Sequence, residues 1–308
     1  MNVTVVGAGI AGVACARALV SAGVTVRVLE RASVGGRMCS GPWRGRPVDT
    51  GAGYFTVSDD RFAAVVARWR AAGVAREWTD TFAVHSADGW ATTTGPMRWA
   101  APGGLASLVE DLADGVDVRR GHEVSRVEPG PLVDGEPADF VVLAMPAPEA
   151  SRLLSADPTA VAGVARSQEW LPSVVAVHEF AERHWDFPAA FVNDHPVLTT
   201  LFDDGSRRGD GAPVLVAHST AALADRFTVD ARAAGEEMAA AVRELLDLPE
   251  PTFSDAWRWD FARPTAPGDR PFHLGSERIG LAGDAWGTPK VETAWLSGTA
   301  LAEAILAS

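Results

Sequence analysis

A six-residue glycine pattern near the N-terminus restricts the fold of this chain more than any other feature. Gly7, Gly9 and Gly12 form a G-x-G-x-x-G sequence that follows an apolar run, residues 3–6, and precedes a helical pattern, residues 11–22. In this position the first glycine permits a tight turn, the second lets the backbone approach a pyrophosphate, and the third lets helix and strand pack closely. Strand, turn and helix together predict a βαβ unit that binds a dinucleotide.

A carboxylate completes this unit. The second expected strand, residues 24–30, ends in Glu30, at the spacing at which a carboxylate accepts hydrogen bonds from a ribose. An acidic side chain at this point disfavours a 2′-phosphate. The alternative is an ordinary glycine-rich turn, and the combination of strand, helix and acid weighs against it.

Two segments far apart in the sequence indicate that the dinucleotide is FAD and not NAD. Gly36 and Arg37 follow the βαβ unit, where an arginine beside glycines can neutralise a second phosphate. Near the other end, an expected strand, residues 279–282, leads into Gly283 and Asp284. In flavoproteins this arrangement places the carboxylate against the ribityl chain, and a plain nicotinamide dehydrogenase has no use for it. The alternative for Asp284 is a helix cap.

The composition excludes several classes of protein. With 27 basic and 40 acidic residues the formal net charge is −13, so the chain should repel phosphate backbones, and we expect no nucleic-acid partner. Two cysteines are too few for a disulfide framework, and the scattered histidines give no metal-binding spacing, so no metal is expected. The apolar stretch 3–16 is interrupted by three glycines and has no basic residue before it. It therefore predicts neither a signal peptide nor a membrane span, and we expect a cytoplasmic protein with no membrane partner.

The remaining pattern indicates alternating helices and short strands. Residues 35–53 show no periodicity and are expected to form a loop. Apolar spacing of i, i+3, i+4 and i+7 predicts helices from residue 60 and over 105–112, with further helices at 234–246 and at the chain end to residue 305. Strands are expected at residues 116–119, 122–128, 140–144, 173–180, 197–202, 213–219, 252–260 and 279–282, with Trp257 and Trp259 on one face.

This order predicts an α/β protein in which a second domain is inserted between the pieces of the first. The first is a Rossmann-like FAD-binding domain, residues 1–58, 100–165 and 262–308. The second is an α+β substrate-binding domain on a mainly antiparallel sheet, residues 59–99 and 166–261.

Five blocks of the sequence resemble the FAD-dependent amine-oxidase superfamily and, within it, the renalase-like branch. They are residues 7–30, 35–38, 49–56, 138–148 and, as the last block, 283–286 with 290–298. Two blocks are typical of that branch: Gly51-Ala52-Gly53-Tyr54-Phe55-Thr56 and Val291-Glu292-Thr293-Ala294-Trp295-Leu296-Ser297-Gly298.

The resemblance implies a set of cofactor contacts. The backbone of Val124 would contact the adenine, and Glu292 would either touch the flavin or cap the last helix. The branch usually carries Gln where this chain has Gly53, so one side-chain contact near the flavin is missing. The expected cofactor-binding residues are Gly7, Gly9, Ala11, Gly12, Glu30, Gly36, Arg37, Gly51, Ala52, Gly53, Tyr54, Val124, Gly283, Asp284, Glu292 and Thr293.

The chemistry that a flavin supplies explains why no His–Asp or Cys–His pair is visible in the sequence. A hydride passes from the donor to flavin N5, and the protein mainly orients the donor and excludes water. We expect aromatic walls around a flat donor, with Tyr54, Trp286, Lys290 and Trp295 as pocket candidates. Core packing is an equal alternative for each tryptophan, and a solvated loop residue for Lys290.

Two other residue types have less to do with the chemistry. His178 and His218 lie on expected strands and are better interpreted as core histidines than as pocket residues. Cys39 lies near the flavin loop, but the covalent cysteine of the superfamily belongs elsewhere. We therefore predict non-covalent FAD.

Three hypotheses for the function follow. The first is an oxidase that acts on a dihydro isomer of NAD(P)H, or on a small amine, and passes electrons to dioxygen, as relatives in this superfamily do. The second is a single-component flavin monooxygenase that uses NAD(P)H; the chain shows no second G-x-G-x-x-G for a nicotinamide. The third is a flavin-binding pathway protein without turnover.

Overall fold

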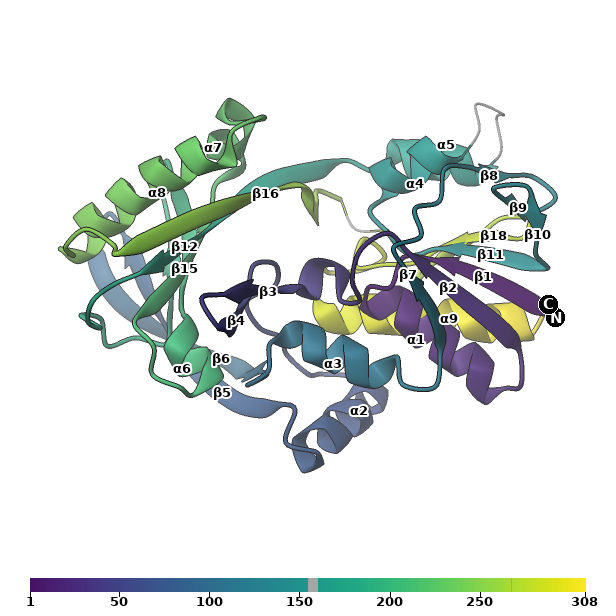
Figure 1. Ribbon diagram of the computed structural model, residues 1–308, viewed down its shortest axis with the longest axis horizontal. Helices are drawn as coiled ribbons and strands as arrows, with labels where there is room; N and C mark the ends of the chain where they lie inside the picture. The colour runs from purple at the N-terminus through teal and green to yellow at the C-terminus, as the bar shows by residue number, and fades with distance from the viewer. Residues whose placement is uncertain (155–159, 267) are drawn as a thin grey trace.

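Two large sheets occupy opposite ends of the molecule (Figure 1). The computed structural model describes residues 1–154, 160–266 and 268–308. Residues 155–159 and 267, which fall in the expected FAD-binding segments 100–165 and 262–308, lie outside the described residues. Both chain termini lie at the far end of one lobe, as Figure 1 shows.

The sheet of this lobe has the parallel arrangement that the βαβ pattern predicts. Its order is β17-β18-β11-β1-β2-β7, and all neighbours are parallel except β17 and β18. The central strands β1, β11 and β18 are short apolar runs that are almost wholly buried, as parallel strands inside a sheet are, whereas the edge strands β7 and β17 are more exposed. Their bounds are β1 (Asn2–Val6), β2 (Thr25–Glu30), β7 (Asp117–Arg120), β11 (Phe140–Leu143), β17 (His273–Leu274) and β18 (Ile279–Leu281).

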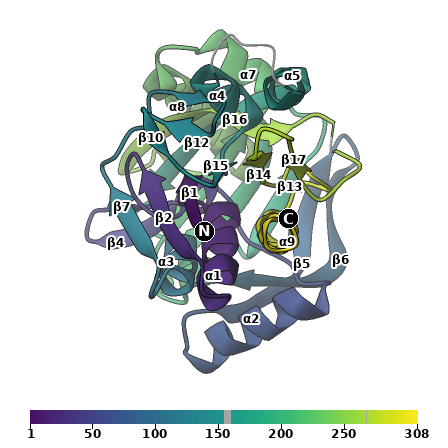
Figure 2. The ribbon, with the colours of Figure 1, turned by 90° about the vertical axis from the view of Figure 1, so that its right-hand side faces the viewer.

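Helices cover both faces of this sheet. On one face, the core joins α1 (Ile10–Ser21), α3 (Leu105–Leu112) and α9 (Val291–Leu306). On the other, it joins α4 (Ala147–Leu153), α5 (Ala160–Ser167) and a small sheet, whose strands are β8 (Val127–Glu128), β9 (Leu132–Val133) and β10 (Glu136–Pro137). Figure 2 shows α1 and α9 side by side below the sheet. A Cβ atom on Gly298 would lie 2.0 Å from the carbonyl oxygen of Ala11, so glycine permits this close helix contact.

The sheet of the second lobe is mainly antiparallel. Its order is β16-β12-β15-β14-β13-β5-β6, with one parallel pair, β13 and β5. Its bounds are β5 (Arg76–Ser86), β6 (Gly89–Ala100), β12 (Trp170–Glu179), β13 (Ala189–Val192), β14 (Leu198–Asp203), β15 (Val214–Ser219) and β16 (Phe253–Pro264). The other elements are α2 (Asp60–Ala71), α6 (Asp204–Arg208), α7 (Ala221–Arg226) and α8 (Ala231–Leu246).

Alternating side chains give the second sheet two apolar faces. Val174 and Ala176 of β12 belong to the core beneath α7 and α8, whereas Val175 and Val177 belong to a separate aromatic core on the opposite face. This alternation is the period of two expected of a strand. The aromatic face is turned toward the first lobe (Figure 1).

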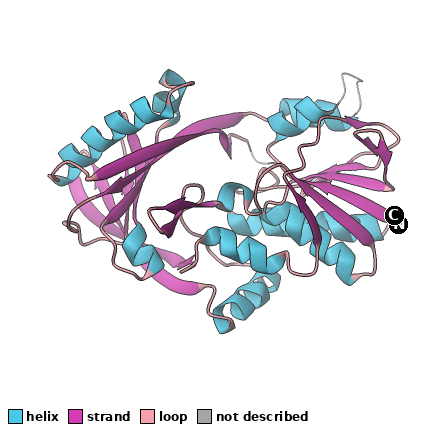
Figure 3. Cartoon of the chain, in the orientation of Figure 1, coloured by secondary structure: helices cyan, strands magenta, loops and turns pink. Residues whose placement is uncertain are grey.

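Two sequence predictions were wrong in detail. Residues 35–53 are not a loop: they hold the short 3₁₀ helix η1 (Gly36–Met38) and a hairpin, β3 (Ser40–Trp43) and β4 (Arg46–Asp49), which lies between the lobes (Figure 3). Its strands are too short to show alternation. The strand expected at 122–128 is reduced to β8, because the N–H groups of Ser125 and Arg126 bond the side chain of Asp134 instead of a neighbouring strand.

The fold class is the one predicted, an α/β protein with a Rossmann-like sheet and a second, mixed sheet. The domain bounds remain a proposal. We divide the chain into residues 1–58, 100–165 and 262–308 against 59–99 and 166–261. This division places the six strands of the first sheet in one domain. The strands of the second sheet fall in the other domain, except for the last residues of β6 and β16.

Candidate functional site

The fingerprint turn leaves the start of α1 open to a ligand. Gly7 has a φ of 99°, and a Cβ atom there would lie 2.7 Å from the carbonyl oxygen of Ala144. Gly9 is the N-cap of α1, and no side chain of the described residues caps the helix. Its first-turn N–H groups are therefore available to a phosphate, which the helix dipole also attracts.

Glu30 stands directly beside this turn. One carboxylate oxygen accepts a hydrogen bond from the N–H of Ala8 and the other from the N–H of Ala32, each at 2.8 Å. These bonds hold the carboxylate at the end of β2, where a ribose is expected. Since a carboxylate has about four acceptor positions, lone pairs remain for hydroxyl groups.

Two glycine-containing loops meet the turn. A Cβ atom on Gly36 would lie 3.1 Å from the Cα of Gly9, and one on Gly51 would lie 2.1 Å from the carbonyl oxygen of Arg37. The N–H of Ala52 also donates to that oxygen, at 2.7 Å. The expected contacts at 9, 36–37 and 51–52 therefore form one continuous backbone surface.

Arg37 and Asp284, which are 247 residues apart, are joined by a two-pronged ion pair. The guanidinium nitrogens lie 2.8 and 2.6 Å from the two carboxylate oxygens. The guanidinium also lies over the ring of Trp170, 4.9 Å from its centroid. Asp284 does not cap the last helix, because α9 begins at Val291 with Lys290 as its N-cap.

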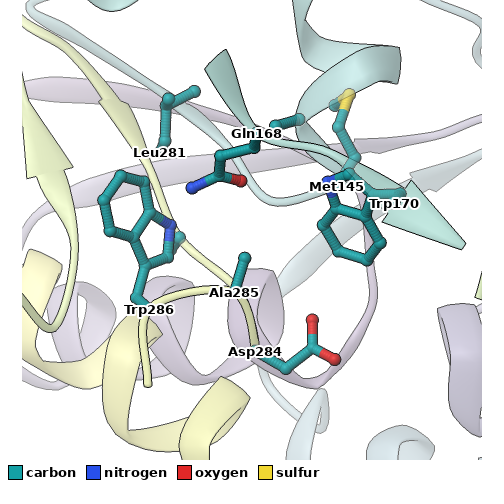
Figure 4. A pocket seen from close by; sticks show the side chains of 10 residues that line it. Met145, Gln168, Trp170, Leu281, Asp284, Ala285 and Trp286 are labelled. Atoms are coloured by element: carbon teal, nitrogen blue, oxygen red, sulfur yellow. The ribbon is translucent and has the colours of Figure 1, made fainter. Parts of the chain in front are cut away.

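A crevice opens beside this ion pair (Figure 4). Its cavity volume is about 10 Å³, room for no more than about one water. It is bordered by Asp284, Trp286, Gln168, Met145 and Trp170, among other residues.

Val124 has a backbone suited to an adenine. Its side chain is buried, while neither its N–H nor its C=O has a hydrogen-bond partner among the described residues. Unpaired backbone groups of a buried residue are uncommon. An adenine that is bound through the protein backbone requires such an unpaired N–H and C=O.

The loop that carries Gly53 and Tyr54 is held by a buried ionic cluster. Arg207 of α6 donates a 3.0 Å hydrogen bond to the carbonyl oxygen of Gly53. A Cβ atom on Gly53 would lie 2.5 Å from the ring of Phe202, so a Gln at this position would displace that ring. We define the cluster as Arg46, Asp49, Asp204, Arg207 and Arg208; its two aspartates have fully buried side chains.

The aromatic face of the second sheet meets Tyr54. The Tyr54 ring packs edge-on against Phe82 at 5.3 Å and against Phe202 at 6.1 Å. The ring of His218 lies 5.2 Å from Phe202 on the same face. Burial and, to a smaller extent, the charge of Arg207 lower the pKa of His218 to about 4, so this histidine is neutral at pH 7.

The other pocket candidates lie in different surroundings. Trp286 borders the crevice and stacks on His273. Trp295 is buried in the core against Phe62, so core packing describes it. Lys290 is exposed and forms no ion pair with the described residues, as the solvated alternative supposed.

Two expected cofactor contacts at the start of α9 form hydrogen bonds within the protein. Glu292 is buried, and its carboxylate accepts hydrogen bonds from the N–H groups of Ser58 and Asp59 and from the Ser58 hydroxyl. It thus orders the segment before α2 and does not cap α9, which corrects the helix-cap alternative. The Thr293 hydroxyl donates to the carbonyl oxygen of Thr288.

The histidine and cysteine environments agree with roles in packing. His178 is fully buried, its Nδ1 bonds the hydroxyl of Ser254, and burial lowers its pKa to about 4. Cys15 is buried within α1, where burial raises its pKa to about 12. Burial also raises the pKa of Cys39, whose sulfur lies 3.2 Å from the Thr50 hydroxyl. Neither thiol has the lowered pKa of a reactive cysteine.

Sequence comparison identifies the family. Residues 5–69 match the NAD(P)-binding Rossmann-like domain, and residues 71–306 match the flavin containing amine oxidoreductase family. The chain belongs to the flavin-containing amine oxidoreductases. It is an FAD-dependent oxidoreductase, and its open helix N-terminus, Glu30 and unpaired Val124 backbone fit that cofactor.

Solved structures of this flavin-containing fold are similar over nearly the whole chain. A putative protoporphyrinogen oxidase from Exiguobacterium sp. 255-15 has a TM-score of 0.75 at 14% identity and covers 100% of this chain and 99% of its own. Cyclohexylamine oxidase from Brevibacterium oxydans IH-35A has a TM-score of 0.74 at 14% identity, over 99% and 98%. Putrescine oxidase bound to putrescine has a TM-score of 0.71 at 17% identity, over 100% of each chain. At these identities the likeness concerns the fold.

Several residues at this flavoprotein site were not anticipated from the sequence. Trp170, Gln168, Phe202 and the ionic cluster come from strands, a short helix and loops without a motif. The one available signal was the run Asp203-Asp204 and Arg207-Arg208 within a strand-rich region.

No helix in the described ranges is long and apolar enough to cross a membrane. Within the same ranges, no three metal-ligating side chains gather into a site.

Proposed function

We propose that this flavoprotein is an oxidase of the renalase-like kind. It takes a hydride from a small reduced donor, a dihydro isomer of NAD(P)H or an amine, and passes the electrons to dioxygen. When bound, FAD accepts the hydride and a proton, and its reoxidation by dioxygen yields hydrogen peroxide. The observation that carries this proposal is the contact of Tyr54, on a cofactor loop, with the aromatic face of the second sheet.

The proposed cofactor-binding residues are those of the sequence analysis. The start of α1, with Gly9, and the Gly36–Arg37 turn would hold the pyrophosphate. Glu30 would accept from the ribose and the backbone of Val124 would contact the adenine. Asp284, which pairs with Arg37, would accept hydrogen bonds from the ribityl hydroxyls. We propose that no covalent bond to the protein forms, since both cysteines have raised pKa values.

The protein side of the reaction is orientation and exclusion of water. The half-buried ring of Tyr54, which is backed by the buried rings of Phe82 and Phe202, forms an apolar wall beside the cofactor loop. A flat donor packed on this wall would be held close to the isoalloxazine, which raises its effective concentration. Neutral His218 would add a polar group without a charge.

The other two hypotheses predict different outcomes. A monooxygenase would consume NAD(P)H and hydroxylate a second substrate. A flavin-binding pathway protein would bind FAD and react with no donor. We place the oxidase in the cytoplasm, because the two cysteines are free and a reducing compartment preserves them.

Anaerobic mixing of the holoenzyme with NAD(P)H, its dihydro isomers and simple amines tests the proposal. We expect bleaching of the oxidised flavin band by the isomers or by an amine, with colour and stoichiometric peroxide returning in air. The matched variants are Tyr54→Phe, which keeps the ring and should keep the rate, and Tyr54→Leu, which removes it and should slow bleaching.

Three outcomes would contradict the proposal. Hydroxylated product would select the monooxygenase. Rapid bleaching by NAD(P)H itself, and by no isomer or amine, would assign a different donor. A holoenzyme that no donor bleaches would leave FAD binding in place and refute the oxidase.

A further inference from the structure

One buried arginine lacks the partner that the others have. Arg98, Arg207 and Arg208 are at most 6% exposed. The last two share Asp49 and Asp204 within the ionic cluster. For Arg98, no carboxylate of the described residues lies within 4.0 Å of its nitrogens. A buried charge is usually paired, because removing it from water is costly.

The hydrogen-bond donors of Arg98 are also in excess. One terminal nitrogen donates to the backbone carbonyl oxygen of Asp80 at 2.6 Å. Its Nε is buried and has no partner among the described residues. A guanidinium has five N–H donors in a planar fork, the shape that matches a carboxylate or a phosphate.

Backbone pairing places Arg98 against the cofactor loop. Phe55 and Trp99 exchange two backbone hydrogen bonds, at 3.2 and 2.8 Å, as an antiparallel bridge. In such a pair, the residues on either side of the bridge point to the opposite face. Arg98 and Tyr54 therefore share a face, and the guanidinium carbon lies 5.7 Å from the Tyr54 ring centroid.

The surroundings hold the guanidinium in place without neutralising it. Its carbon lies 3.9 Å from the ring centroid of Phe82, within the range of a cation–π contact. A cation–π contact and one carbonyl offset part of the cost of burial, but they add no negative charge. Arg98 is thus a positive charge set into the apolar wall that we propose for the donor.

We propose that Arg98 binds an anionic group, a carboxylate or a phosphate, of the donor substrate. This rests on the proposed function and narrows its donor class. The fork of Arg98 pairs with the anion while the apolar part of the donor packs on the half-buried ring of Tyr54. A dihydropyridine nucleotide or an amino acid carries such a group, whereas a simple alkylamine carries none and would be repelled.

The test is calorimetric titration of the oxidised holoenzyme with four benzene derivatives of matched size. Benzoate and phenyl phosphate are anions, benzamide is neutral and benzylamine is a cation. We expect one or both anions to bind at least tenfold more tightly than benzamide, which corresponds to about 1.4 kcal/mol, and benzylamine to bind weakest. The anion that binds more tightly distinguishes a carboxylate donor from a phosphate donor.

Variants assign the effect to this side chain. Arg98→Met should lower anion affinity to that of benzamide, with benzamide itself unchanged, and Arg98→Lys should retain part of the preference. Arg68→Met, at an exposed arginine of α2, should bind as the wild type does. FAD content and thermal midpoint show which variants remain folded.

Equal binding of benzoate, phenyl phosphate and benzamide by the wild-type holoenzyme overturns the proposal without any variant. Anion binding that survives in Arg98→Met also overturns it. Because these titrations need no turnover, they are independent of the oxidase test. A protein that binds the anions through Arg98 yet is bleached by no donor would refute the proposed function alone.

Discussion

Replacing Asp204 by asparagine should destabilise the protein strongly, because this carboxylate holds three arginines. One oxygen lies 2.6 Å from an Nη of Arg207 and 3.4 Å from one of Arg208, and the other lies 2.6 Å from Arg46. The Asp204 side chain is fully buried. In the variant, Asp49 is the one remaining carboxylate in the interior of the cluster.

The magnitude follows from the burial of the charges left behind. Removing one partner of a buried ion pair costs about 3–5 kcal/mol, chiefly because the remaining charge stays buried and unpaired. At a few degrees per kcal/mol, the thermal midpoint should fall by roughly 6–20 °C. Since Arg207 also donates to the Gly53 carbonyl oxygen, the variant should retain less FAD after desalting.

Asp210→Asn is the matched control. Asp210 pairs with the same Arg46 at 2.8 Å, but its side chain is 44% exposed, so the loss should not exceed about 1 kcal/mol. Thermal unfolding of both variants with and without added FAD makes the comparison. If the two midpoints fall equally, or if Asp204→Asn falls by less than the control, the buried cluster does not stabilise the protein as reasoned.

Acid titration gives an independent check. Burial raises the pKa of Asp204, but Arg207, Arg208 and Arg46 lower it more, so the net shift is downward. A carboxyl with a lowered folded-state pKa stabilises above its ordinary value, about 3.9, and loses that stabilisation as the pH falls through the folded-state pKa. The difference in unfolding free energy between the wild type and Asp204→Asn should therefore become smaller in strong acid.

Three further predictions concern glycines and a histidine. In Gly12→Ala the new Cβ would lie 2.1 Å from a carbonyl oxygen of the fingerprint turn, so bound FAD should be lost. The control is Gly163→Ala, whose Cβ would lie in open space on a helix. This variant should keep FAD and should leave stability unchanged or slightly raised. Gly53→Ala should lower the thermal midpoint because its Cβ would meet the Phe202 ring at 2.5 Å. Phe202→Leu in the same chain should recover part of this loss. If the stability changes of the two single variants simply add in the double variant, the contact is contradicted. His178 has a pKa lowered to about 4, so its contribution to stability should fall by about 3 kcal/mol as the pH drops from about 6.5 to about 4. His218, whose pKa is also about 4, adds a similar fall. In thermal melts across this range His178→Asn should therefore remove about half of the pH dependence, and an unchanged dependence would assign it to other groups.

Local patterns were enough for the first βαβ unit of the nucleotide-binding lobe. The run 3–30 contains its own strand, turn and helix, and the positive φ of Gly7 and the placement of Glu30 follow from that local geometry. Arg37 and Asp284 were each singled out by neighbouring glycines. Such signals survive in a sequence because turns, caps and periodicity depend on residues a few positions apart.

Those local patterns did not predict contacts between distant segments. Nothing near Glu292 indicates that its carboxylate bonds residues 58–59, and no periodicity marks the β3–β4 hairpin.

The sequence alone therefore determined the Rossmann-like unit, the flavin and the α/β class, since these depend on backbone geometry and short-range spacing. Tertiary structure alone decided which side chains face the site. Strand register placed Arg98 beside Tyr54, with no carboxylate from residues 1–154, 160–266 or 268–308 within 4.0 Å. Close packing filled the space before Gly53 with Phe202. The physical reason is that a buried charge or ring is defined by what surrounds it, and those surroundings come from strands that meet only when the chain has folded.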